Sequence, residues 1–184
     1  MKRLHALLLI LSLLAAPLAL AADWQAAKGS TLGFRASYMD EAFEGRFARF
    51  SPAIRFDPDA LEDARFDVRI ELATADTDSP DRDEMLVGPD FFDARRAPEA
   101  RYVATSFRHL GGNDYEAKGE LTLNGVTRPV PLRFTWTPGT PATLEGKATV
   151  RRLAFGVGEG DWADTGLLPD EVEVFTRLVL QPRT

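Results

Sequence analysis

The sequence contains no cysteine and only two histidines among its 184 residues. Without cysteine the chain cannot form a disulfide, a thiolate zinc site or a covalent haem attachment. Because His5 lies in the N-terminal segment, His109 is the single imidazole of the rest of the chain. No Gly-x-Ser-x-Gly motif accompanies it, and a Ser-His-Asp triad needs an imidazole between nucleophile and carboxylate. We therefore expect a structural or solvated role for His109.

The sequence also lacks an excess of positive charge and a second long hydrophobic run. Its 28 acidic and 22 basic residues give a formal net charge of −6. This balance argues against nucleic acid, or an anionic membrane surface, as a broad electrostatic partner. Hydrolysis by two carboxylates stays open because acidic residues are numerous, although no pair is marked out by its spacing.

The N-terminus has the three parts of a secretory leader. These are the basic Lys2-Arg3, the apolar run from Leu7 to Leu14, and the small-residue pattern Ala19 to Ala21. The apolar run is shorter than the ~20 residues of a membrane span. We predict a signal peptide over residues 1–21, followed by one exported domain over 22–184 with no transmembrane segment. Export without cysteine fits a bacterial periplasm, although a domain of this length can also do without disulfides.

Apolar and polar residues alternate along several stretches, most clearly from Phe66 to Leu72. This period of two predicts half-buried antiparallel strands. Turn signals at Gly111–Asp114, Asn124-Gly125 and Pro138–Pro141 separate successive strands. The predicted strands are 32–39, 43–56, 66–73, 101–109, 114–123, 128–137, 142–151 and 171–181. Eight strands suffice to close a barrel around a small ligand, so we predict an all-β, eight-stranded antiparallel, lipocalin-like β-barrel.

Two segments interrupt the strand pattern. Ser79 as N-cap and Pro80 at the first helical position predict a short helix that ends near Val87. The second segment is a long glycine-rich loop from Phe155 to Pro169, which carries Trp162 and resembles the loop at a barrel mouth. Its Gly-x-Gly-x-Gly run also looks like a nucleotide loop, but no βαβ unit surrounds it.

The acidic run from Asp76 to Glu84 raises the alternative of a calcium site. It departs from the EF-hand loop because Pro80 holds the third ligand position, Asp81 the glycine position and Val87 that of the bidentate glutamate. Acidic residues at the start of a helix explain the same pattern. We therefore predict no metal site and no cofactor.

Six short motifs, in order along nearly the whole exported chain, resemble the YceI family of periplasmic lipid-binding proteins. The motifs are Gly45-Arg-Phe47, Phe56-Asp-Pro-Asp-Ala-Leu61, Arg82-Asp-x-x-Leu86, Asp90-Phe-Phe-Asp93, Ala97-Pro98 and the stretch from Gly119 to Val130. The resemblance implies a lipocalin-like barrel that holds a long isoprenoid, such as a polyprenyl phosphate or a quinone tail, or a related fatty amide.

One segment departs from the family pattern. Arg152-Leu-Ala-Phe-Gly156 stands where Arg-Ser-Asp-Phe-Gly is usual, and Gly158 to Trp162 follows it. This variant resembles a branch found beside membrane di-haem b-type cytochromes. It implies such a cytochrome, or the quinone pool, as a partner.

The candidate site consists of aromatic side chains that we expect to line the barrel interior. They are Phe34, Tyr38, Phe47, Phe91, Phe92, Phe107, Phe134, Trp136, Phe155 and Trp162. Arg82 and Arg152 are candidates for a ligand head group, although Asp81 and Asp83 could neutralise Arg82. A filled core would use similar aromatics, and Trp162 could equally cap the mouth or pack on the rim.

The expected function is therefore sequestration or transport of an isoprenoid lipid without catalysis. A ligand-free stress or interaction domain and a hydrolytic enzyme are the alternatives. We expect the entrance beside the helix, the turn at Asp90–Asp93 and the loop from Gly156 to Trp162, with the Asn124-Gly125 hairpin at the opposite end.

Overall fold

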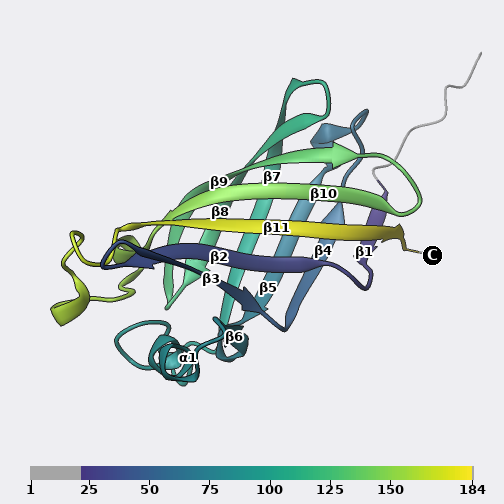
Figure 1. Ribbon diagram of the computed structural model, residues 1–184. Helices are drawn as coiled ribbons and strands as arrows, with labels where there is room; N and C mark the ends of the chain where they lie inside the picture. Colours follow the sequence, from purple (N-terminus) through teal and green to yellow (C-terminus); the bar gives the residue numbers. More distant parts are fainter. Residues whose placement is uncertain (1–21, 184) are drawn as a thin grey trace, which may run out of the picture.

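The computed structural model describes residues 22–183, whose strands form one antiparallel sheet closed into a barrel (Figure 1). β1 pairs with both β4 and β11, so the order β1-β4-β5-β7-β8-β9-β10-β11 returns to its first strand. The bounds are β1 Asp23–Ala26, β2 Thr31–Tyr38, β3 Glu41–Phe47, β4 Phe50–Arg55, β5 Arg65–Glu71, β6 Ala75–Asp76, β7 Glu99–Gly111, β8 Asp114–Leu123, β9 Val126–Thr137, β10 Ala142–Arg151 and β11 Glu171–Pro182. The predicted eight-stranded barrel is confirmed, and the predicted leader lies outside the described residues.

Three positions of the barrel wall are each filled by two short strands in succession. At the first position, β1 and β2 both pair with β11. At the second, β4 pairs with β1 and β3 pairs with β2. At the third, β5 pairs with β4 and β6 pairs with β3. The single strand predicted over 43–56 is therefore wrong: it breaks at Ala48 and Arg49, whose backbone N–H groups donate to the carbonyl and hydroxyl oxygens of Thr74, both at 3.1 Å. β1 and β6 were not predicted.

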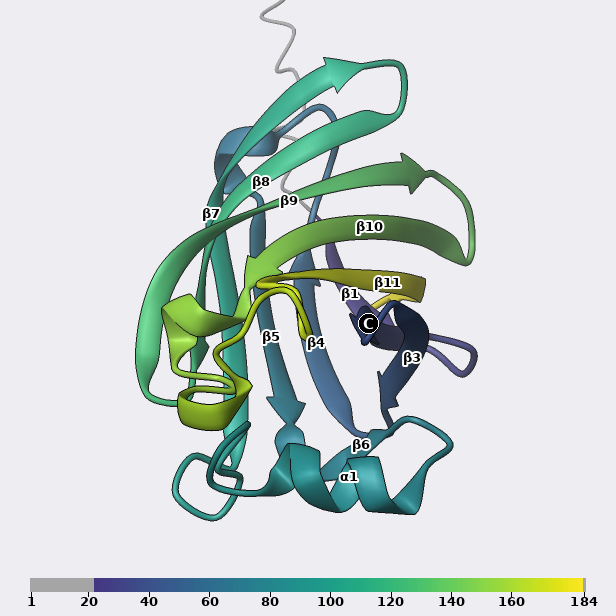
Figure 2. The same ribbon diagram turned by 60° about the vertical axis from the view of Figure 1, so that its left-hand side comes forward.

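Consecutive connections of such a barrel lie at alternating ends because neighbouring strands run in opposite directions. The helix α1, Pro80–Val87, and the segment after it cross one end, which we call the mouth end (Figure 2). The Asn124-Gly125 hairpin lies at this same end: Asn124 binds the Arg96 side chain and donates to the Gly156 carbonyl at 3.4 Å. Its expected place at the opposite end is wrong.

The helix has the predicted bounds, but its start is stabilised differently. The Ser79 side chain makes no capping hydrogen bond. Instead, the Asp83 carboxylate accepts hydrogen bonds from the backbone N–H and the hydroxyl of Thr77, at 2.8 and 2.6 Å. Within residues 22–183, no helix has the length and hydrophobicity that a membrane span requires.

The inward-facing side chains form two clusters, one above the other along the barrel axis. The cluster at the closed end is built around Phe56, Phe66, Phe134 and Trp136, and its members are almost fully buried. The cluster at the mouth end surrounds an open space and includes Phe34, Phe91 and Phe92 among many aliphatic residues. The barrel is therefore filled at one end and hollow at the other.

Candidate ligand-binding cavity

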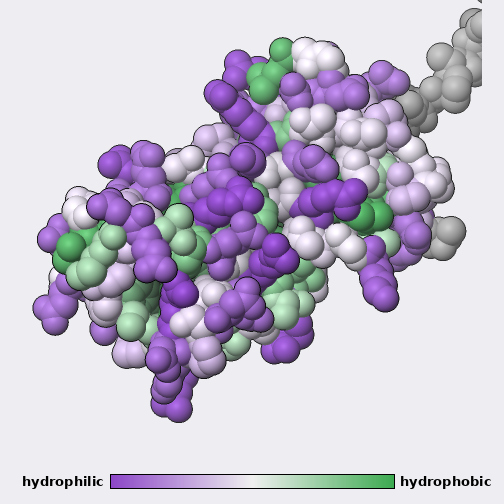
Figure 3. Space-filling model, in the orientation of Figure 1, coloured by the Kyte–Doolittle hydropathy of each residue, from purple (hydrophilic) through white to green (hydrophobic). Residues whose placement is uncertain are grey.

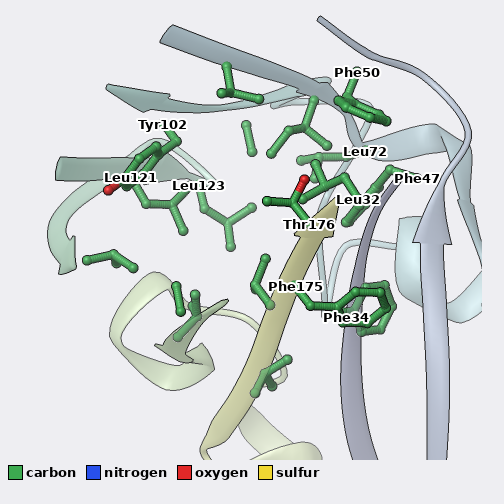
Figure 4. Close-up of a pocket in the computed structure, with 18 of the residues that line it drawn as sticks. Leu32, Phe34, Phe47, Phe50, Leu72, Tyr102, Leu121, Leu123, Phe175 and Thr176 are labelled. Atoms are coloured by element: carbon green, nitrogen blue, oxygen red, sulfur yellow. The ribbon is translucent and has the colours of Figure 1, made fainter. Parts of the chain in front are cut away.

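A cavity of about 200 Å³ occupies the mouth half of the barrel (Figure 4). Its wall comes from β2 to β5, β7 to β11, α1 and the two long segments at the mouth. Most of its lining is aliphatic, and these residues stand at the inward positions of the strands that the alternation predicted. They include Leu32, Val68, Ile70, Leu72, Leu121, Leu123, Val150, Val172 and Val174. The predicted lining was aromatic, and these aliphatic residues were not predicted.

The three polar side chains in the wall already have partners. The Tyr102 hydroxyl donates to the Ala117 carbonyl at 3.4 Å, and that of Thr176 donates to the Thr31 carbonyl at 2.8 Å. Burial raises the pKa of the Tyr102 phenol well above its usual value, so the wall carries no phenolate near neutral pH. Within residues 22–183, no buried side-chain nitrogen or oxygen lacks a hydrogen-bond partner. The cavity therefore suits a hydrocarbon chain.

Arg152 is the third of these polar residues and is only 4% exposed. Its guanidinium donates five hydrogen bonds to backbone carbonyls, at 2.6 to 3.1 Å, using all of its N–H groups. The acceptors are the carbonyl oxygens of Val157, Gly158, Trp162, Leu168 and Pro169. Burial lowers the pKa of the Arg152 guanidinium from its ordinary value. The side chain holds together the segment between β10 and β11, and it has no N–H left for the head group expected from the sequence.

Two glycines make room for aromatic rings in the cavity wall. A Cβ atom on Gly45 would lie 2.3 Å from the Phe34 ring, and one on Gly119 would lie 2.3 Å from the Tyr102 ring. Each ring therefore occupies the space that a side chain at the glycine would need, and glycine is required at both positions of the wall.

The floor of the cavity is an aromatic cluster centred on Phe56, which has no exposed surface. Its ring centroid lies 5.0 to 6.1 Å from those of Phe66, Phe107, Tyr115, Phe134 and Trp136. The structure thus places the predicted lining residues Phe107, Phe134 and Trp136 outside the cavity, in the filled end. They point inward as expected, but they stand at the closed end of their strands.

The other predicted aromatics lie at the mouth end. Phe34, Phe47, Phe91 and Phe92 line the cavity, whereas Tyr38, Phe155 and Trp162 are outside its lining. Phe155 is buried behind the wall, and Tyr38 is 37% exposed. The Trp162 ring lies 5.4 Å from Phe91 and 6.0 Å from Tyr38, so it joins the rim on the outer side.

The mouth is covered by two segments that touch. The Gly158 N–H, from the loop between β10 and β11, donates to the Asp90 carbonyl at 2.7 Å. Phe91, next to that carbonyl, is 6% exposed and contacts Trp162. The contact between Phe91 and Trp162 therefore separates the cavity from solvent on this side.

Arg82 lies on α1 beside the cavity wall. Its guanidinium carbon is 4.3 Å from the ring centroid of Phe43, a lining residue, and its Nε donates to the Thr77 hydroxyl at 3.1 Å. Asp83 is occupied by Thr77, and Arg82 forms no ion pair within residues 22–183. Of the two predicted head-group arginines, Arg82 is the one with free donors.

The groups considered for catalysis or metal binding are not gathered into a site in the part of the chain that the structure describes. The His109 ring stacks on Tyr115 at 4.9 Å, and its Nε2 lies 2.8 Å from the Gly112 carbonyl oxygen. No group of three histidine, aspartate or glutamate side chains in residues 22–183 has the geometry of a metal site.

A closed eight-stranded barrel with a blind, hydrocarbon-lined cavity defines a small-ligand-binding barrel of lipocalin-like architecture. The chain belongs to the YceI family, because the YceI-like domain model matches residues 24–180. The resemblance stated from the sequence is confirmed.

Relatives of known sequence and structure agree with this membership. A UPF0312 protein of Pseudomonas syringae pv. syringae is 30% identical over 89% of this chain and 92% of its own length. The crystal structure of Burkholderia cenocepacia BcnA is 31% identical and covers 81% of this chain and 94% of its own, with a TM-score of 0.78. A polyisoprenoid binding domain from Saccharophagus degradans shares the fold at 16% identity, with a TM-score of 0.67, over 89% of this chain and 99% of its own.

Proposed function

We propose that this protein is an exported carrier that holds the hydrocarbon chain of an isoprenoid lipid in the barrel cavity without altering it chemically. The observation that carries the proposal is the absence of any free polar group in the cavity wall, where the hydroxyls and the Arg152 guanidinium all bind backbone carbonyls. A wall that offers no hydrogen bond favours a hydrocarbon and disfavours a polar substrate. The polyisoprenoid-binding description of a protein with the same fold supports the same ligand class.

The head group belongs outside the cavity, since a charged group without a partner is costly to bury. Arg82 is a half-buried residue whose guanidinium lies over the Phe43 ring, and its terminal N–H groups bind nothing within residues 22–183. It suits a phosphate or the carbonyl oxygen of a quinone. A quinone ligand would favour the membrane b-type cytochrome as partner, a proposal that rests on the sequence from Arg152 to Trp162.

Filling the cavity tests this function directly. Replacing Ala148, an inward residue of the lining, with phenylalanine is expected to abolish lipid retention because the ring occupies the space of the ligand. Ala53→Phe is the matched control, since Ala53 is an exposed residue of β4. The measurement is organic extraction of the purified, folded proteins followed by mass spectrometry.

The identity of the extracted molecule decides among the alternatives. A prenyl lipid in stoichiometric amount in the parent protein and in Ala53→Phe, but not in Ala148→Phe, is the expected result. An empty parent protein would favour the ligand-free interaction domain. A polar molecule retained by Ala148→Phe would favour an enzyme and contradict the carrier.

Export is the second part of the proposal and rests on the composition of residues 1–21. We expect the full chain, expressed in a Gram-negative bacterium, to be recovered in the periplasmic fraction with Ala22 as its first residue. N-terminal sequencing of that fraction checks the cleavage site. A chain that keeps Met1 and stays in the cytoplasm would contradict it.

A further inference from the structure

Large hydrophobic side chains are exposed mainly at the mouth end of the barrel. Within residues 22–183 there are five of them, and four lie at this end: Tyr38 at 37%, Met39 at 59%, Met85 at 42% and Leu167 at 41% exposed. The fifth, Leu110, stands by the hairpin at the closed end. Figure 3 shows hydrophobic surface at the left-hand end, over the loop between β10 and β11. This distribution distinguishes the mouth from the rest of the surface.

Three of these mouth residues, Tyr38, Met39 and Leu167, form one continuous surface together with the half-buried Trp162, and we call this surface the mouth patch. The Met39 N–H donates to the Leu167 carbonyl at 2.9 Å, and the Tyr38 and Trp162 rings are 6.0 Å apart. Tyr38, Trp162 and Leu167 also line an outer groove. Leu168 lines both this groove and the ligand cavity, so the two spaces adjoin at this side chain.

Met39 occupies a position that turn chemistry does not explain. Met39 and Asp40 form the two-residue turn between β2 and β3, with φ angles of 49° and 64°. Such left-handed turns favour asparagine, aspartate and glycine, and the matching turn between β8 and β9 has Asn-Gly. A large exposed apolar side chain stabilises neither the turn nor the core, so we assign it to a contact outside the molecule.

The charges around the mouth patch indicate which apolar surface it meets. Residues 36–45 and 153–170 contain no lysine or arginine, while Asp161 and Asp164 line the outer groove beside Trp162. An anionic lipid surface attracts basic segments and would be repelled here. Zwitterionic lipids present an ammonium group outermost, and carboxylates beside aromatic rings suit that cation.

We propose that the mouth patch docks reversibly on a zwitterionic lipid bilayer, with Met39 and Leu167 entering the head-group region and Asp161 and Asp164 meeting lipid ammonium groups. Tyrosine and tryptophan favour this same interface. Docking there places the lid contact of Phe91 and Trp162 against the membrane, so that a lipid chain moves between bilayer and cavity without crossing water. The proposal rests on the carrier function proposed above.

The test is flotation with phosphatidylcholine–phosphatidylethanolamine vesicles, comparing the parent protein with the double variant Met39→Asn/Leu167→Asn. Asparagine suits the left-handed turn at Met39, and the Leu167 side chain is exposed, so we expect the double variant to fold. We expect vesicle binding to fall by at least about tenfold, because binding scales with the apolar area inserted. The control Leu110→Asn removes an equally exposed leucine at the closed end and is expected to bind as the parent does.

Two further measurements separate the possible outcomes. Binding of the apolar dye N-phenyl-1-naphthylamine measures whether the cavity takes up a ligand, and its affinity should be equal in all variants. A parent protein that binds vesicles but not the dye would contradict the carrier function and leave the docking proposal intact. Docking is refuted if the double variant floats as well as the parent, or if Leu110→Asn loses as much. Stronger binding to phosphatidylglycerol vesicles would contradict the proposed preference for zwitterionic lipids. A concentration-dependent dimer without vesicle binding would contradict membrane docking and show that the mouth patch binds a second copy of the protein.

Discussion

Replacing Arg152 with methionine is expected to lower the free energy of unfolding by about 3–5 kcal/mol, because each buried carbonyl left without a hydrogen bond costs about 1–3 kcal/mol and the costs within one network do not add in full. Methionine has a similar length and no donor, so five backbone carbonyls lose their partner together. Because these carbonyls span residues 157–169, the loss falls on the segment that covers the mouth. Urea unfolding, followed by tryptophan fluorescence, measures the change.

Arg151 supplies the matched control for this experiment. It is the neighbouring residue, but it is exposed and forms a surface ion pair with Asp170 at 3.0 Å. Arg151→Met should therefore change stability by no more than about 1 kcal/mol. Equal stability of the two variants would contradict the structural role of Arg152 and restore it as a candidate for the head group.

Replacing Phe56 with alanine is expected to destabilise the barrel by about 3–5 kcal/mol, the usual cost of deleting a fully buried ring. Phe56 contacts five other aromatic rings at the closed end, and none of them can fill the space without leaving its own packing. The space would adjoin the floor of the ligand cavity at Phe66. Equilibrium unfolding in urea measures the loss.

Phe107→Ala is the comparison for Phe56→Ala because it deletes the same ring from the edge of the same cluster. Phe107 is half-buried and contacts Phe56, Phe66 and Phe134. We expect a smaller loss of stability there, since less apolar surface is returned to water. The interpretation would be wrong if Phe107→Ala cost more than Phe56→Ala, or if Phe56→Ala were nearly neutral.

Sequence patterns determined the parts of the fold that depend on neighbouring residues. Alternation from Phe66 to Leu72 fixes which side chains face inward, and the Asn124-Gly125 pair predicts the hairpin that the structure contains. The end of the barrel at which each connection lies also follows from sequence, because connections alternate between ends. Counting connections from the helix would have placed Asn124-Gly125 at the mouth.

The height of each inward side chain along the barrel was harder to obtain from sequence. Phe34 and Phe134 both alternate correctly, yet Phe34 lines the cavity and Phe134 fills the closed end. Height depends on the strand register and on the breaks within strands, which involve residues far apart in the chain, such as Ala48 and Thr74. Phe56 stands at the end of the predicted strand 43–56, just after β4, and it was not predicted as the centre of the floor because its five ring contacts come from distant segments.

By itself, the sequence determined that this protein is an eight-stranded antiparallel barrel of the YceI family with a short helix after Ser79, because periodicity, turn chemistry and local motifs are read from adjacent residues. Only the tertiary structure decided where the barrel is hollow and what Arg152 does. A cavity is the space that side chains from many strands fail to fill, and the five carbonyls around Arg152 converge only when residues 157–169 fold back over the mouth. Both properties arise from packing between distant segments, which no local pattern contains.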